Sequence, residues 1–116
     1  MIEIKVPYRL QSPNVKEHWS KTHKRNKKIR SLLLSYLPDL SNCQLPCNVT
    51  LTRVGPRSLD HDNLVYAFKF IVDEISDKLI PGLARGRADG LGNIEFEYKQ
   101  RKGNPKEYAI IVRIDS

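Results

Sequence analysis

The chain has 116 residues, of which 40% are hydrophobic and 28% charged, with a formal net charge of +7. This length predicts one domain spanning residues 1–116, and the composition excludes a disordered tail, a collagen-like repeat and a small disulfide scaffold. The apolar runs are far shorter than the roughly 20 residues that cross a bilayer, so no membrane partner is expected. Charged residues at Glu3, Lys5 and Arg9 interrupt the start of the chain, so no secretory signal is expected and a cytoplasmic location is predicted.

The first half of the chain predicts a strand, a long helix and a second strand. Residues 2–6 alternate between apolar and polar side chains, which is the period of a half-buried strand. Residues 14–37 contain neither Gly nor Pro and predict a helix that is basic in its first half. Residues 49–54 predict the next strand. The apolar stripe of the helix is Ile29, Leu32, Leu33, Tyr36 and Leu37.

The second half predicts a helix over 62–79 and two strands. Residues 81–92 contain four glycines and predict a loop. Residues 94–99 and 108–114 alternate strictly enough to predict strands joined by a turn. The order β-α-β-α-β-β predicts an α+β fold, with a small mixed or antiparallel sheet covered by two helices. The apolar face of the second helix is Leu64, Phe68, Ile71, Ile75 and Leu79.

Positive charge is concentrated between Lys16 and Arg30. This segment holds seven bases and one acid, so it carries +6 and leaves +1 for the rest of the chain. A concentrated cationic segment favours a polyanionic partner such as nucleic acid. The alternative is a solvated helix face without a partner.

Asp60-His61-Asp62-Asn63 stands at the predicted start of the second helix. Two carboxylates at i and i+2 of an extended segment point to the same side and can bind one hard cation. The alternative is that Asp60 or Asp62 caps the helix and stabilises its dipole.

Three further residues extend this candidate site. On one continuous helix, Asp62, Lys69 and Asp73 would share a polar face. Lys69 can form an ordinary ion pair on the helix surface, or its ammonium can offset charge developing on a phosphate. Asp89, in the glycine-rich loop, is a further carboxylate. The combination favours metal-assisted cleavage of a nucleic-acid phosphodiester.

Three segments of the chain together resemble the RusA family of Holliday junction resolvases, and most closely its phage and prophage members. They are DHDNLVYAFKFIVDEISDKL, the glycine-rich loop with Asp89 followed by IEFEYKQRKG, and the opening SPNVKEHWSKTHKRNKKIR. The resemblance implies a RusA-like fold and a homodimeric, Mg²⁺-dependent endonuclease, with Mn²⁺ as a substitute. Its partner would be branched double-stranded DNA, nicked during recombination and repair, in the cytoplasm of a bacterial host if the chain is phage-encoded.

By position, the resemblance makes Asp60, Asp62 and Asp89 the metal-binding acids and adds Lys69 and Asp73 to the catalytic set. This chain has Tyr66 where the best-known bacterial members have their lysine, and it has one loop acid where many members have two. The alternatives are a non-catalytic DNA-binding module or a degenerate phage protein with the same fold. The residues predicted to bind DNA are Asn14, His18, Trp19, Lys21, Lys24, Arg25, Lys27 and Lys28.

Overall fold

A four-stranded mixed sheet forms one layer of the computed structural model, which describes residues 1–10, 19–40, 43–80 and 94–115. The strand order is β1-β4-β2-β3, and β4 is antiparallel to both of its neighbours whereas β2 and β3 are parallel. This confirms the α+β class and the mixed sheet. The strands are β1 (Ile2–Val6), β2 (Cys47–Gly55), β3 (Ile94–Lys102) and β4 (Ala109–Asp115).

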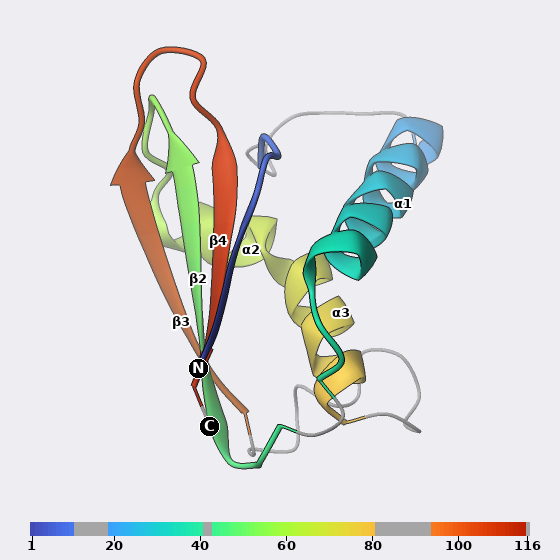
Figure 1. Cartoon of the computed structure of the whole chain (residues 1–116). Coiled ribbons are helices and arrows are strands. Elements are labelled where there is room, and N and C mark those ends of the chain that lie inside the picture. Colours follow the sequence, from blue (N-terminus) through green and yellow to red (C-terminus); the bar gives the residue numbers. More distant parts are fainter. Residues whose placement is uncertain (11–18, 41–42, 81–93, 116) are drawn as a thin grey trace.

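The helices α1 (Trp19–Tyr36), α2 (His61–Ala67) and α3 (Lys69–Leu79) lie together on one face of the sheet (Figure 1). A parallel pair of strands needs a crossover connection, and here α2 and α3 supply it between β2 and β3. The predicted element order is therefore confirmed, except that the second predicted helix is two helices. None of the helices in the described ranges is long and apolar enough to span a membrane.

The core lies between the helices and the sheet. Alternate residues of the central strands, such as Val49, Leu51 and Val112, are fully buried, as period-2 patterning requires. All five residues of the predicted apolar face of the second helix are also buried. In α1, Ile29, Leu33 and Leu37 are buried as predicted, Leu32 is half-buried, and Tyr36 is exposed at the end of the helix.

The prediction of one continuous helix over 62–79 is wrong, because the chain bends at Phe68 (Figure 1). The Phe68 amide still donates to the Leu64 carbonyl at 3.2 Å, and its carbonyl accepts from the Val72 amide at 2.8 Å. The Phe68 side chain is completely buried, with its ring centroid 6.1 Å from that of Tyr98 on β3. The bend keeps the apolar side chains of both helices in the core, so periodicity alone does not reveal it.

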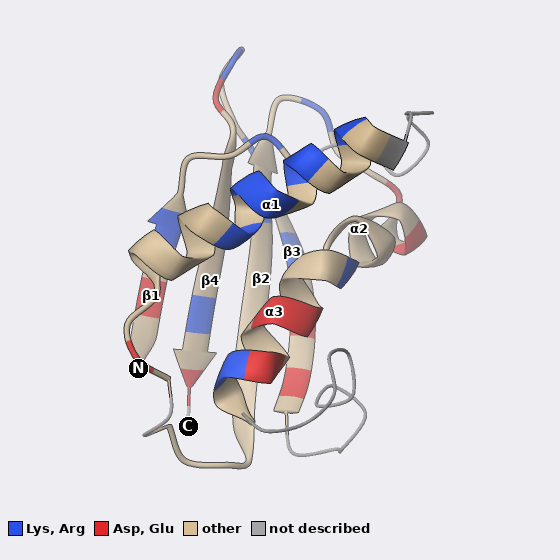
Figure 2. Cartoon of the chain, turned by 90° about the vertical axis from the view of Figure 1, so that its right-hand side faces the viewer, with Lys and Arg blue, Asp and Glu red and all other residues tan. Residues whose placement is uncertain are grey.

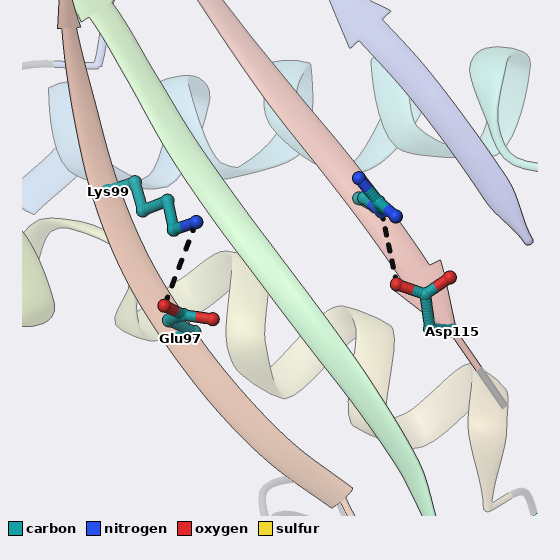
Figure 3. A network of polar contacts seen from close by, with 4 residues as sticks. Glu97, Lys99 and Asp115 are labelled. Carbon is teal, nitrogen blue, oxygen red and sulfur yellow. Dashed lines mark hydrogen bonds and ion pairs between the residues drawn. The ribbon is translucent and has the colours of Figure 1, made fainter.

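The opposite face of the sheet carries charged pairs (Figure 3). The Lys99 Nζ lies 3.7 Å from the Glu97 Oε1 on β3, and the Arg113 Nε lies 3.0 Å from the Asp115 Oδ2 on β4. Each pair joins residues i and i+2 of one strand, which share a face of the sheet. These side chains are largely exposed, so the pairs contribute little to stability.

Arg53, near the end of β2, is buried without an acidic partner in the part of the chain that the structure describes. Its Nε donates to the Leu10 carbonyl at 3.1 Å and its Nη1 to the Arg57 carbonyl at 2.6 Å. Burial lowers the pKa of Arg53; Tyr108 opposes this shift, and the neighbouring charge of Arg9 adds to it. Arg53 therefore joins the segment after β1 to the segment after β2 through its guanidinium.

Replacing Phe68 with alanine should destabilise the fold strongly. Phe68→Ala opens a cavity where α2, α3 and β3 meet, and we expect a loss of about 3–5 kcal/mol in the free energy of unfolding. Leu34, which is 60% exposed, is the matched control. Leu34→Ala should change the free energy of unfolding by less than about 0.5 kcal/mol. Urea unfolding followed by circular dichroism measures both. Equal effects of the two variants would contradict the placement of Phe68 in the core.

Candidate nucleic-acid and metal site

Asp60 is the residue that precedes α2, and its side chain makes no capping hydrogen bond. The helix begins with the Leu64 amide donating to the Asp60 backbone carbonyl at 2.8 Å. The Asp60 side chain is exposed, as is that of Asp62 in the first turn. Helix capping therefore does not account for the Asp60 carboxylate, whereas Asp62 is placed to stabilise the helix dipole.

The local geometry at these two aspartates differs from the one predicted. Asp60 has extended backbone angles, φ −59° and ψ 152°, but the helix already begins at His61. The premise that an extended strand-like segment aligns Asp60 with Asp62 is therefore wrong. The two carboxylates instead flank the point at which the chain changes from extended to helical.

Gln100 on β3 holds the segment just before Asp60. Its Oε1 accepts from the Leu59 amide and its Nε2 donates to the Leu59 carbonyl, both at 2.7 Å. This two-point contact ties the start of the crossover to the edge strand. Sequence reasoning missed Gln100, although it continues the period-2 row of Phe96 and Tyr98 on the side of the sheet that faces the helices.

Lys69 and Asp73 form the ion pair that their spacing predicts. The Lys69 Nζ lies 3.2 Å from the Asp73 Oδ1, and the Lys69 side chain is 60% exposed. The predicted face shared with Asp62 required a continuous helix, and the bend at Phe68 removes that argument. The relation of Lys69 to Asp60 and Asp62 therefore does not follow from helical spacing.

Several predicted site residues lie outside the described part of the chain. These are Asp89, Asn14 and His18, together with the side chain of Trp19 at the start of α1. Within the described ranges, no group of three His, Cys, Asp or Glu side chains could hold a metal ion. Mg²⁺ is commonly bound through one or two carboxylates plus phosphate oxygens of the substrate. The exposed pair Asp60 and Asp62 fits that donor set.

The basic residues of α1 divide into two groups. Lys21, Lys24, Lys27 and Lys28 are exposed on the helix, which suits contact with phosphates. Arg25 and Arg30 are only partly exposed. Burial raises the pKa of Tyr8, and the nearby charge of Arg25 opposes that rise.

Arg30 connects α1 to α3. Its Nε lies 3.0 Å from the Glu74 Oε1, and the Glu74 side chain is only 9% exposed. The Arg30 guanidinium also lies over the Phe70 ring, 5.6 Å from the centroid. One of the seven bases of the cationic segment therefore has a structural role, whereas the exposed lysines have no such contact in the part that is described.

Tyr66 is a second residue that the sequence reasoning did not assign to the site. It is 70% exposed and lies four residues after Asp62, one helical turn along α2. Its position off the apolar stripe of Leu64 and Phe68 could have indicated this exposure. An exposed aromatic ring next to a carboxylate offers a stacking surface for a nucleobase.

Removing the Gln100 contact should loosen the start of α2. In Gln100→Leu both hydrogen bonds to Leu59 are lost, and we expect about 1–2 kcal/mol of lost stability and faster amide exchange at Leu59. Gln100→Glu is the matched variant, since a carboxylate can accept from the Leu59 amide but cannot donate to its carbonyl. The amide exchange rate at Leu59 in Gln100→Glu should lie between those of the wild-type protein and Gln100→Leu. Unchanged exchange in Gln100→Leu would show that the contact does not hold this segment.

Comparisons of the chain with models of known protein families, with characterised proteins and with solved structures found no match. The structure itself establishes an α+β fold with the aspartate pair at the start of the crossover between β2 and β3.

Proposed function

We propose that this chain is a Mg²⁺-dependent endonuclease of the RusA type that nicks branched double-stranded DNA. One observation carries the proposal: the exposed Asp60 carboxylate is not used to cap α2, and Asp62 follows it within the first turn. The surrounding protein is strongly basic, as a DNA-binding protein requires.

In this proposal Asp60 and Asp62 hold the metal ion, with Asp89 as a third ligand. A bound Mg²⁺ supplies an activated water and stabilises the departing oxygen of the phosphodiester. Gln100 keeps the backbone before Asp60 in place through its contact with Leu59. Lys69 offsets negative charge on the phosphate, and Asp73 positions its ammonium through the 3.2 Å ion pair.

The exposed lysines of α1 bind the DNA backbone, and Asn14, His18 and Trp19 contribute further contacts to the DNA. Two copies of the chain act together, because a two-fold dimer matches the near two-fold symmetry of a four-way junction. Each copy would then cut one of two equivalent strands.

Neutralising either aspartate should abolish nicking and leave DNA binding intact. We expect Asp60→Asn and Asp62→Asn each to lower the cleavage rate of a synthetic four-way junction by at least about 100-fold, since each removes a ligand of the ion. Glu95→Gln, which neutralises an exposed acid on β3, is the matched control and should cut at the wild-type rate. The assay compares four-way junction, fork, duplex and single strand, with and without Mg²⁺.

Wild-type nicking by either aspartate variant would overturn the site assignment. A wild-type protein that binds junctions equally well with and without Mg²⁺, and yields no nicked product, would support the non-catalytic DNA-binding module instead.

Neutralising exposed lysines of α1 should weaken binding rather than chemistry. In Lys24→Gln/Lys28→Gln, two phosphate contacts are lost, so the slope of log affinity against log salt should fall by about two units. Fluorescence anisotropy with a labelled junction in EDTA measures this. An unchanged slope would remove α1 from the DNA interface.

A further inference from the structure

Positive charge also gathers at one end of the sheet on segments other than α1. Figure 2 shows Lys and Arg mainly in the half of the molecule toward which β2 and β3 run, and Asp and Glu mainly in the other half. The exceptions in the basic half include the start of α2, where Asp60 and Asp62 lie. Outside the segment from Lys16 to Arg30 the charges sum to only +1. This sum conceals the separation of basic and acidic residues between the two halves of the molecule.

Four exposed bases from three segments meet at this end, and we call them the sheet-end cluster. In the parallel register, Val54 pairs with Arg101 and Gly55 with Lys102, and the Gly103 amide donates to the Gly55 carbonyl at 2.9 Å. Chain continuity places the other two members beside them, one after β2 and one in the turn between β3 and β4. The cluster is Arg57, Arg101, Lys102 and Lys106.

The sheet-end cluster has almost no acidic counterpart. Segments 53–58 and 100–108 contain a single acid, Glu107, and its Oε1 accepts a hydrogen bond from the Asn104 amide at 3.2 Å. Within the described residues, none of the four cluster side chains takes part in an ion pair. No acid in the described ranges therefore compensates these four charges.

Two further cations contact the segments that carry the sheet-end cluster. The guanidinium of Arg53 is buried and bonded to two carbonyls, one of them that of Arg57. Arg9, whose guanidinium lies 4.8 Å from the centre of the Tyr108 ring, is close enough to repel Arg53. Like charges gathered around a partly desolvated cation raise the free energy, and a bound anion would lower it.

We propose that the sheet-end cluster binds the phosphate backbone of double-stranded DNA, in addition to the exposed lysines of α1. Exposed cations without neighbouring acids suit the closely spaced negative charges of a duplex. An anionic membrane is the less suitable partner, because a few basic residues without large apolar side chains to insert attach only weakly to a membrane. The exposed large apolar residues of the described chain all lie outside segments 53–58 and 100–108.

The position of the sheet-end cluster links it to the aspartate pair. Arg57 precedes Asp60 by three residues, and Arg101 follows Gln100, whose side chain holds Leu59. A phosphate backbone bound by Arg57 would thus run close to Asp60. The inference rests on the proposed function only in taking DNA as the partner, and it adds a second contact surface that the α1 lysines do not supply.

The test compares two double variants with the same change in net charge. Arg101→Gln/Lys102→Gln alters the sheet-end cluster, and Lys5→Gln/Lys78→Gln removes two bases that lie outside it. Anisotropy with a labelled four-way junction in EDTA excludes cleavage. For the cluster variant we expect the salt slope to fall by about two units and affinity at 0.1 M salt to fall at least about tenfold. The control variant should lose less than about threefold in DNA affinity.

Arg57→Gln, which keeps the backbone carbonyl bonded to Arg53, should lower the salt slope by about one unit.

Equal losses in the two double variants would overturn the inference, because net charge alone would then explain binding. The inference would also be overturned if the cluster variant bound DNA like the wild-type protein, or if the wild-type protein did not bind DNA. Binding to phosphatidylserine vesicles is measured in parallel, and a loss of vesicle binding without a loss of DNA binding would likewise overturn it. Thermal unfolding verifies that the variants are folded. If the cluster variant shows the expected loss while the wild-type protein never nicks DNA, the proposed nuclease fails and the sheet-end cluster stands. If the wild-type protein nicks DNA and the cluster variant binds DNA normally, the proposed nuclease stands and the role of the sheet-end cluster fails.

Discussion

The parallel pairing of β2 with β3 is the constraint on which the rest of this structure depends. Nine residue pairs, from Cys47 with Ile94 to Gly55 with Lys102, fix the two strands in one direction. The chain must therefore return across the sheet between them, and α2 and α3 do so on the face that carries the core. Both strands then end at the same edge, where the candidate site and the sheet-end cluster lie. Open sheets with parallel strands commonly place their ligand sites at the carboxyl ends of those strands.

Local patterning was sufficient to predict the elements, since alternation gave the strands and the steps of three and four residues gave the buried helix faces. The bend at Phe68 could not be predicted, because no Gly or Pro marks it and the apolar spacing continues through it. The site was predictable only in part. Asp60 stands at the helix start as its sequence context indicates, but the Gln100 contact joins residues 41 positions apart. The sheet-end cluster depends on the register of β2 with β3, which a sequence count of charges does not contain.

The electrostatics of the two ends of the sheet explain why the total charge is a poor guide to partners. Acids such as Glu3, Glu95 and Asp115 lie toward the end opposite the sheet-end cluster and offset the exposed bases in the sum without neutralising them in place. At physiological ionic strength, charges separated by more than about 8 Å are largely screened from one another. A polyanion that approaches the basic end therefore meets a locally cationic surface, although all residues outside the segment from Lys16 to Arg30 together carry only +1.

The acids of the crossover differ in a way that bears on their role. Asp73 is paired with Lys69 at 3.2 Å, so part of its charge is already compensated. Asp60 and Asp62 have no ion pair within the described residues, and the Asp60 side chain does not cap the helix. They are nevertheless held at the basic end of the sheet, on a segment fixed by Gln100. Two carboxylates next to the proposed DNA-binding surface would repel the phosphates that the surrounding bases attract. A divalent cation shared by the carboxylates and a phosphate removes that repulsion. The same arrangement without a cation would weaken a simple DNA-binding module, so the placement of Asp60 and Asp62 favours metal-dependent chemistry over binding alone.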